Sequence, residues 1–321
     1  MRALLLETID AAAHAELAEQ ATTTLAPTPD AEPDDRDLTD VDAIITRGSG
    51  RVTSELIARC PNLRVIGRCG VGLDNVDVEA ATAAGIAVIN APGSPTVTTA
   101  EHTLMLILAL TRQLYPQVAA VKDDDWAIRS RVSADECAGK TLGVIGLGAI
   151  GYRVAEMSAA LGMEVVAHNR TNRNRAEGRP SVRQLPLAEL LAESDIVTLH
   201  VALTPETRGL IGRAELAAMK AGALLVNTAR GALVDVDALL SALDSGRLAG
   251  YAADGVDPEP PAPGDRLIHH PRTIVTPHSA ALTASTYRRT CLRTVRNVLG
   301  YLTGSHYEAE SVFNAAQLPS T

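Results

Sequence analysis

Aromatic residues and cysteines are scarce in this chain. Of its 321 residues only one is Trp, one is Phe and six are Tyr, so a core must be built from Ala, Val, Leu and Ile. The four cysteines, at positions 60, 69, 137 and 291, include no C-x-x-C pair. This spacing indicates neither a disulfide framework nor a zinc site. We therefore expect reduced thiols, as in an intracellular protein, and no bound metal.

Long apolar runs and an excess of positive charge are also missing. The longest apolar run, Leu104–Leu110, is far short of the roughly 20 residues that cross a membrane. The N-terminal MRALLLETID has too short an apolar run for a signal peptide. The net charge of −9 argues against a sequence-independent nucleic-acid surface. We expect a soluble, cytoplasmic protein that binds neither nucleic acid nor a membrane.

The length and the order of elements predict two α/β domains. Strands alternate with helices from the start, which is typical of a parallel sheet covered by helices. We predict strands at Arg2–Leu6, Val41–Thr46, Leu63–Gly67 and Ile86–Asn90, and further on at Leu142–Ile145, Glu164–His168, Asp195–His200, Ala223–Asn227, Leu248–Asp254 and Thr273–Thr276. A last helix, Ala284–Tyr301, is expected to return to the N-terminal part.

These elements give a predicted domain plan. A Rossmann dinucleotide-binding domain, residues 95–282, is inserted in a flavodoxin-like substrate-binding domain formed by residues 1–94 and 283–321. Within the predicted Rossmann domain, Thr99–Val121 is predicted to be one long, mostly apolar helix interrupted at Pro116. A helix that is apolar on nearly every face is buried between larger bodies. We therefore expect this helix to pack against a second subunit in a homodimer.

The segment Thr141–Leu161 contains a dinucleotide fingerprint. Gly146, Gly148 and Gly151 follow a predicted strand at G-x-G-x-x-G spacing and open a helix. In this motif the first glycine permits the tight turn, the second lets the backbone approach a pyrophosphate, and the third lets the helix pack on the strand. Ala149 and Ile150 stand where the helix start offers N–H groups to phosphates. We predict that these five residues bind a dinucleotide.

Four segments that follow predicted strands carry polar residues that folding alone does not require. They are Arg68–Asn75, Asn227–Gly231, Asp254–Pro260 and Thr276–Ala280. Each one has a structural alternative, such as an arginine that caps a strand, an acid in a solvated loop, or a buried histidine. Because the carboxyl ends of parallel strands meet at one edge of a sheet, the four segments together indicate a hydride-transfer site.

At these motifs the sequence resembles the D-isomer-specific 2-hydroxyacid dehydrogenases. The matching stretches are RCGVGLDNVDVEAA, GKTLGVIGLGAIG, NTARGALVD, GYAADGVDPEP and TPHSA, in the family's order and spacing. The resemblance covers essentially the whole chain and is strongest to the phosphoglycerate dehydrogenase branch, through VIGRCGVGLDNVD and residues 122–139. The sequence stops near Thr321, so we expect no room for the C-terminal regulatory domain that many members of that branch carry.

The resemblance implies roles for individual residues. His278 would be the general acid/base, since the pKa of histidine lies near working pH. Glu259, rather than Asp257, would hydrogen-bond its imidazole and fix its tautomer. Arg230 would bind the substrate carboxylate and polarise the reacting carbonyl, a bidentate role that suits Arg better than Lys. The backbone N–H groups of Gly70, Val71 and Gly72 would bind the other carboxylate oxygen. We also predict cofactor contacts at Thr228, Ala229 and Asp254.

The end of the second nucleotide-binding strand bears on the choice of cofactor. NAD enzymes usually have an Asp or Glu there, about 20 residues after the glycines. This chain has His168–Arg175 (HNRTNRNR), which contains three arginines and no acid. Asn169, Arg170 and Thr171 are predicted cofactor contacts, because Arg170 with Thr171 can bind a 2′-phosphate. We therefore expect a preference for NADP; the alternative is a solvated arginine loop and NAD bound through backbone contacts.

The substrate is indicated by a group of arginines. Arg47, Arg51, Arg68, Arg129 and Arg131 lie where the resembled branch gathers positive charge around a phosphate-bearing substrate. Against a net charge of −9, such a cluster would focus an anion into the site. A phosphate- or phosphonate-bearing 2-hydroxy acid is our first prediction. Glyoxylate or hydroxypyruvate reduction, a phosphite-type dehydrogenase, and a non-catalytic dinucleotide-sensing protein are the alternatives.

Overall fold

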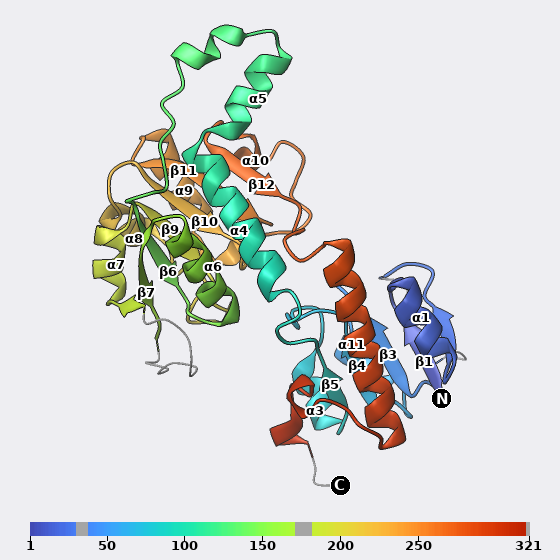
Figure 1. Cartoon of the computed structure of the whole chain (residues 1–321). Helices are drawn as coiled ribbons and strands as arrows, with labels where there is room; N and C mark the ends of the chain where they lie inside the picture. The colour runs from blue at the N-terminus through green and yellow to red at the C-terminus, as the bar shows by residue number, and fades with distance from the viewer. Residues whose placement is uncertain (30–37, 171–181, 319–321) are drawn as a thin grey trace. The chain divides into compact units, whose positions relative to one another are not determined.

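The computed structural model describes residues 1–29, 38–170 and 182–318. The chain forms two compact units, coloured along the chain in Figure 1. Unit 1 consists of Met1–Pro95 and Leu282–Thr321, and unit 2 consists of Thr96–Ala281. Each unit is built on one parallel β-sheet with helices around it, which confirms the predicted α/β class.

Unit 1 has a five-stranded sheet in the order β2-β1-β3-β4-β5. Its strands are β1 (Arg2–Leu5), β2 (Thr22–Leu25), β3 (Ala43–Thr46), β4 (Val65–Arg68) and β5 (Ala87–Ile89). Four of them were predicted within two residues. The sequence did not predict β2, because TTTL carries no buried apolar run and lies at the sheet edge. Every residue of β3 and β5 is buried, as expected for parallel strands covered on both faces.

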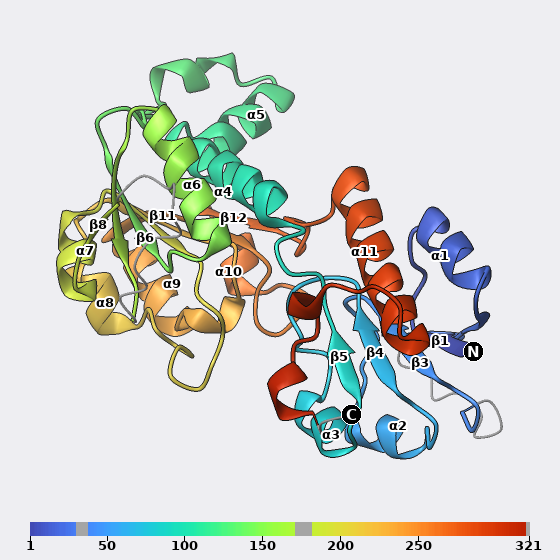
Figure 2. The same cartoon turned by 60° about the horizontal axis from the view of Figure 1, so that its bottom comes forward.

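Helices cover both faces of the unit 1 sheet (Figure 2). On one face, α1 (Ala11–Ala18) and α11 (Ala284–Thr303) pack on the strands through residues such as Leu17 and Val295. On the other face lie α2 (Ser54–Ala58) and α3 (Val78–Ala83). The capping side chains of Asp10, Thr53, Asp77 and Thr283 accept hydrogen bonds from the first turns of these four helices. Two short 3₁₀ turns, Ala309–Ser311 and Ala315–Gln317, follow α11.

Unit 2 has a seven-stranded parallel sheet in the order β12-β11-β10-β9-β6-β7-β8. Its strands are β6 (Thr141–Ile145), β7 (Glu164–His168), β8 (Arg183–Gln184), β9 (Ile196–Leu199), β10 (Ala223–Asn227), β11 (Leu248–Asp254) and β12 (Thr273–Thr276). All but β8, an exposed two-residue edge strand, were predicted to within one residue. Because every neighbouring pair is parallel, the loops after these strands lie at one edge.

The helices of unit 2 form two layers. On one face α4 (Thr96–Thr111) and α6 (Ala149–Ala160) pack on the sheet. On the other face lie α7 (Leu187–Glu193), α8 (Arg213–Ala218) and α9 (Val236–Asp244). The remaining elements are α5 (Leu114–Lys122), the 3₁₀ turns η2 (Trp126–Ser130) and η3 (Gly231–Leu233), and α10 (Arg266–His269).

The long helix predicted over Thr99–Val121 is two helices. The chain breaks at Gln113, whose φ of 50° is left-handed, and α4 and α5 meet at a bend of 66°. The prediction of a break at Pro116 was wrong, because this residue lies in the first turn of α5, where an N–H has no partner within the helix. No residue of α5 is buried, and α5 projects from the rest of unit 2 (Figure 1).

Across the described ranges, no single helix is long and apolar enough to cross a membrane. The bent pair of α4 and α5 passes that test by length and composition only.

Candidate active site

The glycine loop connects β6 to α6 at the carboxyl edge of the unit 2 sheet. Gly146 has φ = +100°, and a Cβ there would lie 2.8 Å from the backbone carbonyl of His200. At Gly151 a Cβ would lie only 2.0 Å from the carbonyl oxygen of Gly146, so the helix packs directly on the loop. Gly148 faces open space and precedes the first helical residue, Ala149. The N–H groups of the first turn of α6 therefore lie beside a glycine with no atoms packed over it. This arrangement suits the binding of a pyrophosphate.

The end of β7 is fastened to this glycine loop. Asn169, at the place where NAD enzymes usually have an acid, accepts a hydrogen bond from the backbone N–H of Leu147 through Oδ1, at 2.7 Å. Arg170 lies next to it, and hydrogen bonding by Thr204 together with the positive charge of Arg170 lowers the pKa of Glu206. Thr171, the third residue predicted to contact the cofactor here, lies outside the described residues.

His278 and Glu259 form the central pair of the candidate site. Nδ1 of His278, in the loop after β12, lies 2.8 Å from Oε2 of Glu259, in the loop after β11. The side chain of His278 is 46% exposed and that of Glu259 is 41% exposed, so a substrate can reach them. Gly255, with φ = +100°, makes the contact possible, because a Cβ there would lie 2.1 Å from Oε1 of Glu259. His278 itself has a left-handed φ of 52°, uncommon for a residue other than glycine.

Asp254, the last residue of β11, holds the loop that carries His278 in place. Its buried carboxylate accepts hydrogen bonds from the backbone N–H of Ser279 (2.8 Å, Oδ1) and Ala280 (2.7 Å, Oδ2). These are the two residues after His278, so Asp254 orients the backbone that carries the imidazole. In the part of the chain that the structure describes, no three His, Cys, Asp or Glu side chains form a metal-binding group.

Two polar side chains of α4, which the sequence did not single out, support the strand ends that carry the site. His102 Nε2 lies 3.0 Å from Oγ1 of Thr276, which in turn donates to Oδ1 of Asp254 at 2.6 Å. One residue further along α4, the hydroxyl of Thr103 is hydrogen-bonded to that of Thr228 at 2.8 Å. A polar residue in the middle of an apolar helix was the only available signal for these contacts, and it does not identify a partner.

Arg230 lies in the loop after β10, between the glycine loop and the His278 loop along the sheet edge. Asn227 shapes this loop, since its amide donates to the carbonyl of Arg230 (2.8 Å) and accepts from the N–H of Ala229 (3.0 Å). At Gly231 a Cβ would lie 2.4 Å from the carbonyl carbon of Val256. The Arg230 loop is thus packed against the segment that leads to Glu259.

Unit 1 carries Arg47, Arg68 and the Gly70–Gly72 loop among the predicted substrate-binding residues. The guanidinium of Arg47 lies 3.4 Å from Oε2 of Glu7 and over the ring of Tyr287, at 5.3 Å from its centroid. The side chain of Arg68 folds over Gly70, where a Cβ would lie 1.2 Å from Nη1.

The glycine-rich loop after β4 is held by its own hydrogen bonds. The N–H of Gly70 donates to the carbonyl of Arg68 at 2.8 Å. Asn90 and Ala91 donate to the carbonyls of Val71 and Gly70. The predicted anion contact by this loop therefore falls to the N–H groups of Val71 and Gly72.

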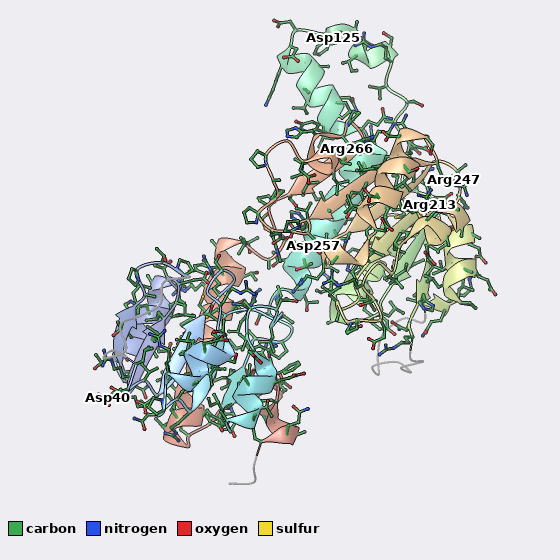
Figure 3. All side chains as sticks on the ribbon, turned by 180° about the vertical axis from the view of Figure 1, so that it is seen from behind. Asp40, Asp125, Arg213, Arg247, Asp257 and Arg266 are labelled. Carbon is green, nitrogen blue, oxygen red and sulfur yellow. The ribbon has the colours of Figure 1, made fainter. Side chains whose placement is uncertain are left out.

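Arg129 and Arg131 are not brought to His278 in the same chain. Both follow α5, in or just after η2, and Arg131 forms an ion pair with Asp125. Figure 3 shows Asp125 in the segment that projects from unit 2, and Asp257, in the loop of Glu259, far from it on the body of unit 2.

Comparisons with known proteins agree with this geometry. Residues 104–280 match the family model described as "D-isomer specific 2-hydroxyacid dehydrogenase, NAD binding domain". The chain is 39% identical over 271 residues to a glyoxylate reductase of Aeropyrum pernix, covering 83% of this chain and 81% of that protein. The chain belongs to the D-isomer specific 2-hydroxyacid dehydrogenases, a family of NAD(P)-dependent enzymes.

Two further comparisons bear on the substrate. The chain is 40% identical over 286 residues to a D-3-phosphoglycerate dehydrogenase of Archaeoglobus fulgidus; the match covers 89% of this chain but 53% of that protein. The chain thus spans about half the length of the phosphoglycerate dehydrogenases it matches. A crystal structure of a glyoxylate reductase from Paecilomyes thermophila superposes with a TM-score of 0.85 at 33% identity, covering 95% of this chain and 96% of that one.

Proposed function

We propose that this chain transfers a hydride between a bound nicotinamide dinucleotide and C2 of a small D-2-hydroxy acid or 2-oxo acid. The observation that carries the proposal is the 2.8 Å contact between His278 and Glu259, half-exposed at the same sheet edge as the glycine loop. When bound, the nicotinamide supplies or accepts the hydride. Residues 146–151, Asn169, Arg170, Thr228 and Ala229 would hold the dinucleotide.

The contacts of His278 indicate which of its ring nitrogens exchanges a proton with the substrate. Its Nδ1–H donates to Glu259, which leaves Nε2 for the substrate oxygen. In reduction, Nε2–H protonates the carbonyl oxygen of the 2-oxo acid; in oxidation, Nε2 accepts the hydroxyl proton. Arg230 binds the substrate carboxylate through its planar guanidinium. Asp254 orients the loop of His278 through its hydrogen bonds to the two following N–H groups.

For the substrate we propose a phosphate- or phosphonate-bearing 2-hydroxy acid. Arg47, Arg68 and the N–H groups of Val71 and Gly72 would bind its anionic groups, and the likeness to phosphoglycerate dehydrogenases supports this choice. Glyoxylate or hydroxypyruvate is the second candidate, because glyoxylate reductases match at nearly the same identity and over most of their length.

We propose NADP as the preferred cofactor. Asn169 replaces the usual acid, and Arg170 beside it can pair with a 2′-phosphate.

We also propose a homodimer formed through the segment from Leu114 to Arg131. This segment exposes Leu114, Tyr115, Val118, Val121 and Trp126. Beside its base, a hollow of about 490 Å³ is lined by Tyr115, Pro116 and the residues around β10 and β11. A second copy would cover these apolar side chains. It would also give Arg129 and Arg131 a substrate to contact, namely that of the partner.

A panel assay tests the function. We expect the highest kcat/KM with D-3-phosphoglycerate and NADP, against D-glycerate, glyoxylate, hydroxypyruvate and phosphite with either cofactor. A higher kcat/KM with glyoxylate would make glyoxylate the proposed substrate. The absence of turnover with every 2-hydroxy and 2-oxo acid tested would overturn the enzyme proposal.

The variant Asn169→Asp tests the choice of cofactor. It keeps the acceptor for the N–H of Leu147 but adds a negative charge, so the ratio of kcat/KM with NADP to kcat/KM with NAD should fall by about tenfold or more. Arg213→Ala, on α8, is the matched control.

A further inference from the structure

His102 is a polar side chain on the mostly apolar helix α4, and it contacts the strand ends of the candidate site. Its side chain is 15% exposed, and its Nε2 lies 3.0 Å from Oγ1 of Thr276 and 3.7 Å from Oδ1 of Asp254. The side chain of Asp254 is only 2% exposed. Because a buried polar group costs free energy unless it is hydrogen-bonded, these contacts hold the imidazole in one place.

The single proton of the Thr276 hydroxyl determines how His102 is bonded. Oγ1 of Thr276 lies 2.6 Å from Oδ1 of Asp254, and since a carboxylate only accepts, this proton points at Asp254. The same Oγ1 can then only accept from His102, so the imidazole carries its proton on Nε2. The three side chains therefore form a directed chain, in which the ring N–H donates to the hydroxyl and the hydroxyl donates to the carboxylate.

Asp254 connects this chain to the loop of His278. Its two oxygens accept hydrogen bonds from the N–H groups of Ser279 and Ala280, at 2.8 and 2.7 Å. His278, just before these residues, has a left-handed φ of 52°. For a residue other than glycine this conformation costs free energy and persists only where the surroundings impose it. A carboxylate that turned away would release both N–H groups and, with them, the backbone conformation that carries the imidazole.

We propose that His102 is a positioning residue for the proposed hydride transfer, and that it acts on His278 through Thr276 and Asp254. The Nε2–H of His102 fixes the Thr276 hydroxyl, and the hydroxyl fixes the carboxylate of Asp254. The carboxylate then holds the backbone that presents the imidazole to Glu259 at 2.8 Å. The effect of His102 on turnover rests on the proposed function, whereas its effect on the backbone does not.

Amide hydrogen exchange, measured by NMR on the full chain, tests the effect on the backbone. His102→Leu removes the ring N–H, and Thr276→Val removes the hydroxyl with little change of shape. In both variants the amides of Ser279 and Ala280 should exchange about fivefold faster or more, because their acceptor is held less firmly. The amides of the central strand β9 should keep their rate.

Glu101→Gln, at an exposed position of the same helix, is the control and should leave all these rates unchanged. Unchanged exchange of Ser279 and Ala280 in His102→Leu would overturn the proposal. An equal acceleration in β9 would also overturn it, because it would show a general loss of stability rather than a loosened loop.

Steady-state kinetics test the effect on turnover. We expect His102→Leu to lower kcat by about tenfold or more, because a misplaced catalytic group is costly, with the dissociation constant of the dinucleotide little changed. His102→Gln, whose amide can donate from near the position of Nε2, should recover most of this loss. A role in packing alone would give no such recovery, so a kcat of His102→Gln equal to that of His102→Leu would overturn the proposal.

A double variant tests whether His102 acts through Thr276. His102→Leu, Thr276→Val should be no slower than the slower single variant, because both changes break the same chain. A kcat reduced by the product of the two single losses would overturn the proposal. If the unmutated protein turns over no 2-hydroxy or 2-oxo acid but the exchange result holds, the proposed function is wrong and the role of His102 in holding the loop stands.

Discussion

The two ring nitrogens of His278 have different surroundings. Nδ1 is bonded to Glu259 at 2.8 Å, while the side chain as a whole is nearly half exposed. Asp257, the other acid of this loop, lies instead 3.4 Å from the guanidinium of Arg208. The choice of Glu259 over Asp257, made on the resemblance, therefore agrees with the contacts that each acid makes.

Removing the imidazole should abolish most of the turnover. We expect His278→Ala to lower kcat by about 10²- to 10⁴-fold, the usual contribution of general acid–base catalysis, with the dissociation constant of the dinucleotide little changed. Glu259→Gln should have a smaller effect, because the imidazole stays in place. Steady-state kinetics and cofactor titration measure both. His269→Ala, an exposed histidine on α10, is the control; turnover of His278→Ala near that of the control would contradict the assigned role.

The loop after β3 is organised around the carboxylate of Glu7, which lies just after the end of β1. Oε1 of Glu7 accepts hydrogen bonds from the backbone N–H groups of four successive residues, 47 to 50, at 2.6–3.1 Å. Burial raises the pKa of Glu7, but these hydrogen bonds and the charge of Arg47 outweigh it, so the pKa lies below its ordinary 4.5. Glu7 thereby holds Arg47 in position.

Glu7→Gln keeps an acceptor oxygen but removes the charge. We expect a loss of about 1–3 kcal/mol in the free energy of unfolding at pH 7, together with a raised KM. Because the folded-state pKa of Glu7 is depressed, its stabilisation is present above pH 4.5 and is lost as the pH falls through the lowered pKa. Thermal melts of the variant and the unmutated protein should therefore converge as the pH is lowered below 4.5. Glu19→Gln, at an exposed site, is the control; equal stability at pH 7 would contradict this role.

The helices α4 and α5 differ in what they contact. α4 is buried along one side, at residues such as Ala100 and Leu106, whereas α5 has no buried residue. Tyr115 is 67% exposed and Trp126 is 70% exposed, although aromatic side chains are otherwise scarce. The composition of this stretch predicted burial, and within one chain the prediction fails for α5. A second copy is the occupant that we propose.

Disrupting the apolar face of this segment should separate the subunits. We expect the unmutated protein to sediment as a dimer and the double variant Tyr115→Glu, Trp126→Glu to sediment as a monomer, because charges at a covered apolar surface are costly. Sedimentation equilibrium over a range of concentrations measures this. Phe313→Glu, an equally exposed aromatic in unit 1, should stay dimeric. A monomeric unmutated protein would contradict the dimer.

The pattern of residues along the chain was sufficient to predict the two parallel sheets, because buried parallel strands are continuous apolar runs. It also predicted the glycine turn, since the spacing of the glycines is a local feature, and the loops that carry Arg230, Glu259 and His278. Only the folded chain brought His102 close to Asp254 and Glu7 into the loop of Arg47. These contacts join residues 40 and 152 positions apart, and a short sequence motif has no information about such partners. The edge strands β2 and β8 and the helix break at Gln113 were also missed, since their position depends on neighbours rather than on composition.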